Sequence, residues 1–331
     1  MVTSPALSDV RALVTGGAGF IGSHLSDRLT ARGHEVIIVD SFDPFYDPAI
    51  KHRNIAGALA SGRARLVEAD IADQKAIDAA IGDETIDAVI HLAARAGVRP
   101  SLDKPAAYVR TNVEGTVSML EFAKRRGIRS FVMGSSSSVY GDNTPVPFSE
   151  DVPAANPISP YAATKRAGEL LCHTYAHLYG LSVMCLRLFT VYGPRQRPDL
   201  AIHKFAKLIT SGRSIPFYGD GSTERDYTYV SDIVDGIEGA LKWTVAAEAG
   251  AFETVNLGEN TTTSLSRLVE MLSAEFGVEA RLERLPAQPG DVERTFASID
   301  KARALIGYDP CTPMEDGIHR FAEWFRQQPA I

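Results

Sequence analysis

Tyr161 and Lys165, four residues apart in Tyr-Ala-Ala-Thr-Lys, are the residues of this sequence best suited to chemistry. Residues at this spacing lie on one face of a helix, one turn apart. A tyrosine titrates near pH 10, roughly three units too high for a base at neutral pH. A neighbouring ammonium, together with the positive charge of an oxidised nicotinamide, is expected to lower the tyrosine pKa. The pair therefore predicts a proton acceptor beside a hydride acceptor, which is redox chemistry on an alcohol.

The N-terminal region has a pattern typical of dinucleotide binding. An apolar run at 11–15 precedes three glycines spaced three apart from Gly16, an amphipathic stretch at 21–32 and a second apolar run ending in Asp40. Such glycines allow a tight turn and close approach of the backbone to a pyrophosphate, and the helix N-terminus adds partial positive charge. An acid about 20 residues further on accepts hydrogen bonds from the adenosine ribose. Because a carboxylate repels a 2′-phosphate, the sequence favours NAD over NADP.

The composition restricts the class of protein. A length of 331 residues suggests one large α/β unit with an elaborated C-terminal part. The net charge of −7 leaves no basic surplus to neutralise phosphates, which argues against nucleic-acid binding. The apolar runs are strand-length, far short of the ~20 residues of a membrane span. Because the N-terminus also lacks the pattern of a secretory signal peptide, we expect a cytoplasmic protein that does not associate with a membrane.

The three cysteines, Cys172, Cys185 and Cys311, show no metal-ligand spacing and cannot all pair with one another. Cys185 lies in an apolar strand pattern and Cys172 in a helical one, so we interpret these thiols as buried and structural. No histidine spacing indicates a metal site, and none is expected.

Apolar runs of strand length alternate with helical stretches through the first 190 residues. A long helix is predicted over 105–126, and another carries Tyr161. Strands are predicted at 11–15, 35–40, 65–70, 87–93, 130–135 and 182–188. This alternation predicts an α/β fold with a doubly wound parallel sheet of the Rossmann type, covered on both faces. Ligands bind at the carboxyl ends of such strands, where the sequence has Asp40, Asp70, Ala93, Ser135 and Thr190.

Beyond Thr190 the pattern loosens. A helix is predicted at 200–211, a strand at 215–218, and a second helix that Ser231 or Asp232 caps and that runs to about Thr244. A strand at 254–257 is expected to return to the main sheet, followed by two helices and short strands. We therefore predict a dinucleotide-binding domain over 1–190, to which 230–256 returns, and an interleaved substrate domain formed by 191–229 and 257–331.

Together these stretches resemble the extended short-chain dehydrogenase/reductase family, and within it the NAD-dependent nucleotide-sugar epimerases and dehydratases. The resemblance runs from Gly16 to about Ile306. Its motifs are the glycine-rich segment 15–24, His91-Leu-Ala-Ala94, Asn112-Val-Glu-Gly115, the serine-rich segment 135–141, Tyr161-x-x-x-Lys165 and Arg225-Asp-Tyr227. The family places a catalytic hydroxyl four residues before the Tyr-Gly pair at 140–141. The resemblance thus implies a catalytic triad of Ser136, Tyr161 and Lys165.

The resemblance also implies which residues hold the cofactor, NAD. His91 is interpreted as a structural residue at a strand end. The implied cofactor-binding residues are Gly16, Gly19, Phe20, Ile21, Gly22, Asp40, Asp70, Ile71, Ala93, Tyr161 and Lys165.

The serines after the fifth strand decide between the reactions of this family. Dehydratases of the family carry an Asp-Glu pair in this motif, and decarboxylases carry a glutamate just before Val-Tyr-Gly. Here Ser136-Ser-Ser138 occupies these places. Epimerisation at C4 needs neither acid. The closest resemblance is to UDP-glucuronate 4-epimerases, through the segments 94–99, 135–141 and 186–199.

By that resemblance, Ser137, Ser138, Thr190 and Arg197 would face the C6 carboxylate of the sugar, with Arg195 as an alternative to Arg197. Arg225 would bind the diphosphate, with Asp226 as an orienting partner. Phe217 would lie near the uracil and Asp291 near the uridine ribose. The implied substrate-binding residues are Arg99, Asn112, Ser137, Ser138, Thr190, Arg197, Phe217, Arg225 and Asp291.

The expected reaction is NAD-dependent conversion of UDP-glucuronate to UDP-galacturonate through a 4-keto sugar, without loss of CO₂. Within enzymes the alternative is a UDP-glucose or UDP-N-acetylhexosamine 4-epimerase, and then a nucleotide-sugar 4,6-dehydratase. Outside enzymes it is an NAD-responsive binding protein. By analogy with the family, helices near 105–126 and 161–180 would form a homodimer.

Overall fold

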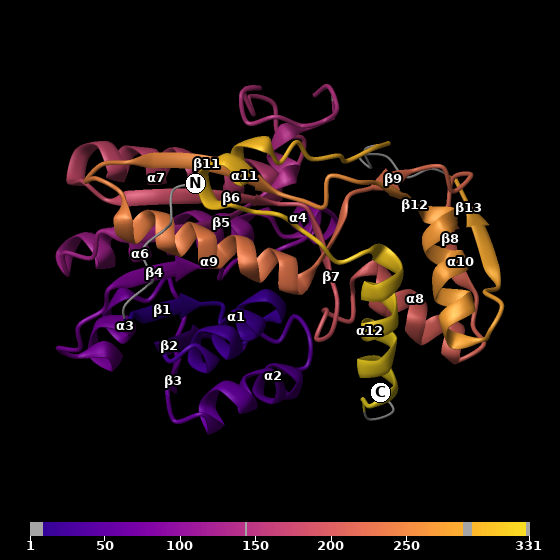
Figure 1. Ribbon diagram of the computed structural model, residues 1–331, viewed down its shortest axis with the longest axis horizontal. Helices are drawn as coiled ribbons and strands as arrows, with labels where there is room; N and C mark the ends of the chain where they lie inside the picture. The colour runs from indigo at the N-terminus through magenta and orange to yellow at the C-terminus, as the bar shows by residue number, and fades with distance from the viewer. Residues whose placement is uncertain (1–8, 143, 287–292, 329–331) are drawn as a thin grey trace.

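A seven-stranded parallel sheet forms the centre of the protein in the computed structural model, which describes residues 9–142, 144–286 and 293–328 (Figure 1). From β1 the chain moves outward first in one direction and then in the other, so the topological switch point lies between β1 and β4. This order confirms the predicted Rossmann-type α/β class. In spatial order the strands are β11 (Phe252–Leu257), β6 (Ser182–Leu188), β5 (Ser130–Ser136), β4 (Ala88–His91), β1 (Arg11–Thr15), β2 (Glu35–Asp40) and β3 (Ala64–Glu68).

The strands end close to where the sequence predicts. β3 and β4 stop two residues earlier than expected, so Asp70 and Ala93 lie in the loops beyond the last pairing. β5 extends to Ser136 and pairs with Leu188 at the end of β6. The polar side chains at the carboxyl edge are therefore held partly by strands and partly by loops.

Helices cover both faces of the sheet because alternate strand residues point to opposite sides. Val14 packs into the core on the face covered by α1 (Phe20–Ala31), α2 (Pro48–Ala60) and α9 (Val230–Ala246). Figure 1 shows these three helices on the same face of the sheet. Leu13 packs into the opposite core, beneath α3 (Gln74–Ile81), α6 (Gly115–Arg125) and α7 (Pro160–Tyr179).

Two predicted helices differ from the structure. The helix expected over 105–126 consists of α5 (Pro105–Val109), a π-helical turn η1 (Arg110–Glu114) and α6. The expected cap of α9 is wrong, because that helix already begins at Val230 and has no side-chain cap. The carboxylate of Asp232 instead accepts hydrogen bonds from the backbone N and the hydroxyl of Thr312, at 3.2 and 3.1 Å.

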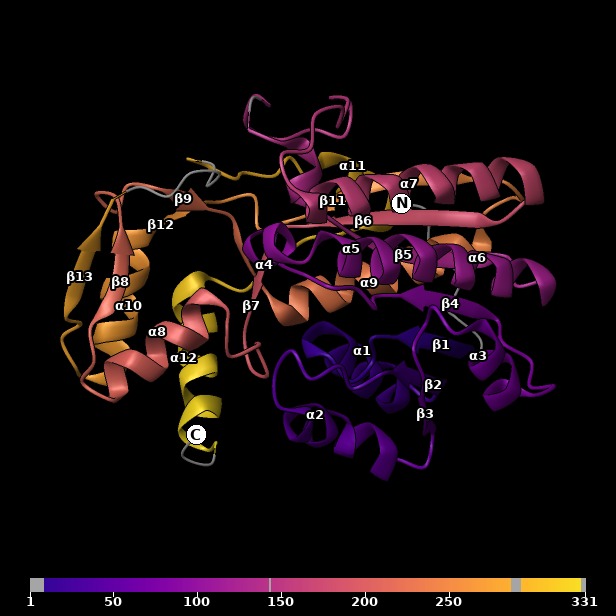
Figure 2. The same cartoon turned by 180° about the vertical axis from the view of Figure 1, so that it is seen from behind.

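Much of the C-terminal part lies to one side of the sheet (Figure 2). Among the described residues three helices follow β11, where the sequence predicts two, and one of them, α11 (Asp300–Ile306), packs back onto α9 and β11. The proposed division at residue 190 and its return over 230–256 stay predictions. The elements are α4 (Val98–Asp103), η2 (Ser137–Tyr140), β7 (Thr190–Tyr192), α8 (Ala201–Thr210), β8 (Ile215–Tyr218), β9 (Glu224–Arg225), β10 (Tyr227–Tyr229), β12 (Thr263–Ser264), α10 (Leu265–Phe276), β13 (Leu282–Leu285), α11 (Asp300–Ile306) and α12 (Met314–Arg326).

The cysteines follow the prediction in part. Cys172 and Cys185 are buried, whereas Cys311 is exposed and contradicts the buried interpretation. Within the described ranges, no helix combines the length and the apolar character that a membrane crossing requires. Among the same residues, no cluster of three or more His, Cys, Asp or Glu side chains is arranged to hold a metal ion.

Candidate active site

The glycine-rich turn after β1 leaves no room for side chains. Gly16 has a φ of +68°, and a Cβ at Gly22 would lie 2.3 Å from the Gly16 carbonyl oxygen. A Cβ at Gly19 would lie 3.1 Å from the same oxygen. Gly19 precedes α1 without a side-chain cap, so the backbone itself forms the surface at the helix N-terminus. These features fit the pyrophosphate of a dinucleotide.

Asp40 lies beside this turn at the end of β2. Its oxygens accept hydrogen bonds from Ala18 N at 3.2 Å and Phe42 N at 2.9 Å. The ammonium of Lys51 is 3.4 Å away and also largely buried, a partner that the sequence pattern did not reveal. The carboxylate is therefore fixed where an adenosine ribose is expected.

The other predicted cofactor residues lie in α1 and in the loops after β3 and β4. Phe20 and Ile21 open α1, and the backbone of Ala93 approaches Gly16 closely enough to exclude a Cβ there. Asp70 accepts hydrogen bonds from Ala72 N at 2.9 Å and from Nη1 of Arg110 at 2.7 Å. Ile71 packs against Gly115.

Ser136, Tyr161 and Lys165 come together at the carboxyl end of β5. Tyr161 is in the first turn of α7, where the hydroxyl of Ser159 accepts a hydrogen bond from Ala162 N at 3.1 Å and caps the helix. Ser136 ends β5, and its hydroxyl lies close enough to the Tyr161 phenol to oppose the rise in the pKa of that phenol. One turn along α7, Nζ of Lys165 donates to the Gly134 carbonyl at 2.7 Å. This arrangement suits removal of a proton from an alcohol by a phenolate.

The electrostatics of Tyr161 differ from the sequence prediction. Burial raises its pKa, and the groups that oppose the rise are Ser136, through its hydroxyl, and Arg197, through its charge. The ammonium of Lys165 is bonded to the Gly134 carbonyl of β5 at 2.7 Å. Burial lowers the pKa of Lys165 to about 8. The charge of Arg197 thus favours the phenolate of Tyr161, and the role predicted for Lys165 stays a prediction.

The side chain of Asn112 has three hydrogen-bond contacts within the protein. Its side-chain oxygen accepts from Arg95 N at 2.8 Å, and its amide nitrogen donates to Arg95 O and to Oγ1 of Thr164, both at 3.0 Å. The amide thus ties the loop after β4 to α7. Asn112 lies in the π-helical turn η1, and such turns are frequent near functional sites. These bonds position the loop after β4, and contact of Asn112 with substrate or cofactor stays a prediction.

His91 is structural, in agreement with the sequence interpretation. Its ring nitrogens contact the hydroxyls of Thr15 and Thr116 at 2.8 and 3.0 Å. Burial, with a contribution from the charge of Lys165, lowers the pKa of His91 to about 3. The imidazole is therefore neutral and links β1, β4 and α6.

Ser137, Ser138 and Thr190 lie half-buried at the same edge of the sheet. Ser137 and Ser138 form the turn η2, in which the hydroxyl of Ser136 accepts from Ser138 N and donates to the Ser138 hydroxyl, both at 3.2 Å. Thr190 lies two residues beyond Leu188, the partner of Ser136 in the sheet. Ser138 thus contacts Ser136 directly, and Ser137 and Thr190 lie close to it along the chain and across the sheet.

The two loop arginines point in different directions. Arg197 pairs with both oxygens of Asp199 and acts electrostatically on Tyr161. Arg195 instead pairs with Asp27 of α1 at 2.7 Å. Asp27 holds the guanidinium of Arg195 against α1, which favours Arg197 over Arg195 as the predicted partner of the carboxylate.

Phe217 does not offer its ring to a ligand, because the side chain is 2% exposed in the core. On β8 the side chains alternate, so Tyr218 faces outward, with the guanidinium of the exposed Arg99 5.4 Å from its ring centre. Strand alternation would have identified Tyr218 as the available ring. Any contact of Phe217 with a ligand is through its backbone.

Arg225 lies on β9 and donates to the carbonyls of Glu224 and Glu293 at 2.9 and 3.4 Å. The neighbouring Asp226 is fully buried and accepts from Glu259 N and Ala297 N at 2.7 and 3.1 Å. Asp226 thereby holds together the segments around Arg225. Asp291 lies outside the described residues.

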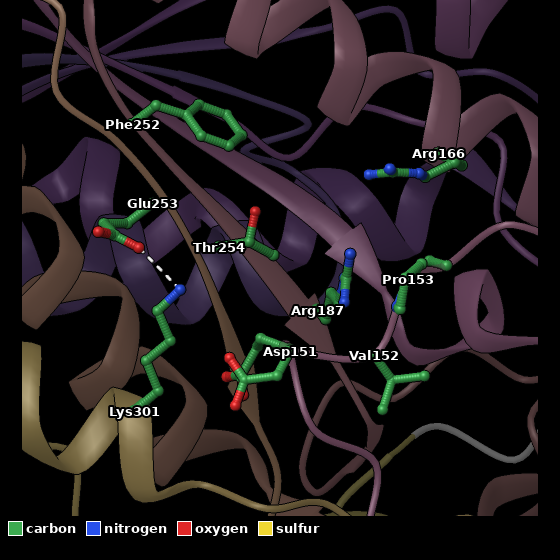
Figure 3. Close-up of a pocket in the computed structure, with 11 residues that line it drawn as sticks. Asp151, Val152, Pro153, Arg166, Arg187, Phe252, Glu253, Thr254 and Lys301 are labelled. Carbon is green, nitrogen blue, oxygen red and sulfur yellow. Dashed lines mark ion pairs between the residues drawn. The ribbon is translucent and has the colours of Figure 1, made fainter. Parts of the chain in front are cut away.

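A separate pocket of about 300 Å³ opens between the loop at 150–154 and the edge strand β11 (Figure 3). None of the predicted site residues that the structure describes lines it. Its buried cation, Arg187, donates to both oxygens of Glu169 at 3.0 Å, and its guanidinium lies 4.7 Å from the Tyr140 ring centre. Because Arg187 is already paired, we assign no ligand to this pocket.

The geometry defines an enzyme that moves a proton and a hydride on an alcohol beside a dinucleotide. Residues 12–258 match the model of the NAD dependent epimerase/dehydratase family, and the chain belongs to that family.

Individual relatives cover nearly the whole chain. A probable UDP-glucuronate 4-epimerase of Rhizobium meliloti is 41% identical over 96% of this chain and 97% of its own. The UDP-glucuronic acid 4-epimerase of Bacillus cereus, solved with UDP-glucuronic acid and NAD, is 35% identical with a TM-score of 0.87, covering 96% of this chain and 99% of that one. A UDP-glucose 4-epimerase of Thermotoga maritima, solved with UDP-glucose, is 32% identical with a TM-score of 0.86, at coverages of 96% and 99%.

Proposed function

We propose that this protein interconverts UDP-glucuronate and UDP-galacturonate by NAD-dependent epimerisation at C4, without loss of CO₂. The observation that carries the proposal is the cluster of Tyr161, Ser136 and Arg197 at the carboxyl edge of the sheet, a base and a cation in one site. The relatives named for UDP-glucuronate support the same substrate. The segment Ser136-Ser-Ser138 has no acid to drive elimination.

The glycine turn, Asp40 and Lys165 are the residues that would hold NAD, which when bound supplies a reversible hydride acceptor at C4. Tyr161 takes the proton of the C4 hydroxyl and later returns it to the C4 oxygen, after the 4-keto sugar has turned so that hydride is added back to the opposite face of C4. The hydroxyl of Ser136, close to the phenol, stabilises the phenolate and relays the proton. Between these steps the sugar turns about its phosphate linkage.

The carboxylate of the 4-keto intermediate must be held in a safe orientation. This intermediate is a β-keto acid and loses CO₂ when its C5–C6 bond aligns with the carbonyl π system. Ser137, Ser138 and Thr190 lie at the edge beside Ser136 and would donate hydrogen bonds to the carboxylate, with charge from Arg197. Control of this kind depends on position, so small displacements change rates strongly.

A second candidate is epimerisation of a neutral sugar, UDP-glucose or a UDP-N-acetylhexosamine. The observation that favours it is the pairing of Arg197 with Asp199, which already supplies the guanidinium with a carboxylate. The Thermotoga maritima relative, named for UDP-glucose, is similar in fold as well.

Turnover of a panel of UDP-sugars tests the proposal. We expect the purified protein to convert UDP-glucuronate to UDP-galacturonate, followed by NMR, with no net consumption of NAD. Turnover of UDP-glucose or UDP-N-acetylglucosamine alone would support the second candidate. Binding of NAD without turnover of any sugar would contradict both and indicate a binding protein.

We infer that the protein is a homodimer joined through α7 and the helices beside it. Three large apolar side chains of α7, Leu170, Leu178 and Tyr179, are 54, 59 and 46% exposed. Val109 on α5, in contact with α7, is 45% exposed. Exposed apolar patches of this kind mark interaction sites. The expected cytoplasmic location stays a prediction.

A further inference from the structure

Arg197 is held by its surroundings on several sides. Its Nε and Nη2 donate to the two oxygens of Asp199 at 3.0 and 2.7 Å, and Nη2 also reaches the Ala96 carbonyl at 3.4 Å. The guanidinium carbon lies 5.0 Å from the centre of the Phe45 ring. The side chain is 15% exposed. One edge and one face of the planar cation are therefore fixed.

These contacts place the cation beside the catalytic phenol. The Ala96 carbonyl that Arg197 reaches also accepts from the hydroxyl of Tyr108 at 3.1 Å. The ring of Tyr108 packs edge-to-face against Tyr161, with 6.2 Å between ring centres. Burial raises the pKa of Tyr161, and the charge of Arg197 is one of the two groups that oppose the rise. Movement of Arg197 is thus felt at the reacting hydroxyl.

Asp199 also determines how Arg197 can meet a sugar. The ion pair uses the edge formed by Nε and Nη2, which leaves Nη1 as the end of the guanidinium for another acceptor. A carboxylate at C6 then receives an end-on contact from a cation that stays in place. Without Asp199, a side-on pair with the substrate would become possible and would draw the cation towards the sugar.

We propose that Asp199 is a positioning residue that fixes Arg197 beside Tyr161, so that the C6 carboxylate of a UDP-hexuronate is held end-on and away from the alignment that releases CO₂. This inference rests on the proposed function. It also explains why Arg197 can bind an acid sugar although it is already paired. The ion pair with Asp199 fixes the position of the guanidinium, and Nη1 binds the C6 carboxylate.

Loss of this control has a defined product. In the 4-keto intermediate the C5–C6 bond breaks, CO₂ leaves, and the electron pair forms an enolate on the keto oxygen. A proton taken up at C5 then gives a UDP-4-keto-pentose. The ratio of five-carbon to six-carbon sugar products therefore reports the orientation of the carboxylate, separately from the rate of reaction.

The test is the product ratio of Asp199→Asn with UDP-glucuronate, measured by liquid chromatography and mass spectrometry. Asparagine keeps the size but removes the charge, so we expect the share of decarboxylated product to rise by about one to two orders of magnitude, the scale on which small misplacements act. Asp199→Glu, which keeps the carboxylate, is expected to restore part of the wild-type ratio. A purely structural role would lower turnover but leave the ratio unchanged.

The same loop offers a matched control. Asp27→Asn removes the carboxylate partner of Arg195, 2.7 Å from its guanidinium, and is expected to keep the wild-type ratio. If Asp199→Asn does not fold, as judged by thermal melting, Phe45→Leu removes the ring from the guanidinium face and is expected to raise the ratio as well.

Two results would overturn the role of Asp199: a wild-type ratio in the folded Asp199 variants, or an equal rise in Asp27→Asn. Failure of the wild-type protein to interconvert UDP-glucuronate and UDP-galacturonate would instead reject the proposed function, and with it this inference. The wild-type reaction therefore separates the two failures.

Discussion

Tyr161 shows how a single residue depends on charges that are distant in the sequence. Its burial disfavours the phenolate, which a base needs, and the protein offsets this with a hydroxyl from β5 and a guanidinium from the loop after β7. Arg197 is separated from Tyr161 by 36 positions in the chain, so no local pattern links them. Lys165, four residues away, is held against the strand instead.

Replacement of Tyr161 by phenylalanine tests the base at the residue scale. Because general base catalysis contributes typically 10²–10⁴-fold, we expect kcat of Tyr161→Phe to fall by about that factor while UDP-sugar still binds. Steady-state kinetics and isothermal titration measure the two effects. Tyr108→Phe, which removes a hydroxyl bonded to Ala96, is the control and should lose much less. Unchanged kcat in Tyr161→Phe would refute the assignment.

At the scale of elements, a buried ion pair fixes α7 to the sheet. Glu169, one turn beyond Lys165, accepts from Arg187 of β6 at 3.0 Å and from the hydroxyl of Ser135 of β5 at 2.6 Å. Both charged side chains are nearly inaccessible. This connection holds the catalytic helix in register with the strand that ends in Ser136.

Glu169→Gln leaves Arg187 buried without a countercharge, and breaking such a pair costs about 3–5 kcal/mol. We expect chemical denaturation at pH 7 to show a loss of this size in the free energy of unfolding. Glu315→Gln, which breaks an exposed pair with Arg267, is the control and should cost less than about 1 kcal/mol.

The effect of Glu169 on stability also depends on pH. Burial opposes ionisation, but the bonds from Arg187 and Ser135 hold the pKa of Glu169 below its ordinary 4.5. The contribution is therefore complete above pH 4.5 and is lost as the pH falls through the folded-state pKa. We expect the difference between wild type and Glu169→Gln to shrink on acidification below pH 4.5. A constant difference would show that the carboxylate charge is not its source.

At the scale of the whole molecule, α5, α6 and α7 lie along one side of the sheet (Figure 2), where apolar side chains of α5 and α7 stay exposed. If this surface forms the dimer, Leu170→Glu with Leu178→Glu should give a monomer in analytical ultracentrifugation, because charges would be buried at the contact. Leu305→Glu on α11, a residue 37% exposed, should leave the dimer intact. A wild-type protein that stays monomeric at high concentration would contradict the inference.

The sequence by itself determined the sheet, the glycine turn and the placing of Ser136, Tyr161 and Lys165 on a strand end and the following helix. Strands and helices show themselves as apolar residues that recur every second residue or every three to four residues, and the turn shows itself as closely spaced glycines. Residues near one another in the chain therefore encode these features. The same locality explains the error at α9, where a possible cap residue was read without its tertiary partner Thr312.

Only the tertiary structure decided which charges act on one another. Asp199 forms an ion pair with Arg197, and Asp27 forms one with Arg195. The side chain of Asn112 is hydrogen-bonded to Arg95 and Thr164. Phe217 faces the core and Tyr218 the surface. Electrostatic effects and hydrogen bonds depend on distance in space and on burial, which the folding of loops from separate parts of the chain sets. Spacing along the sequence gives the residues of this site, and their proximity in the fold gives their roles.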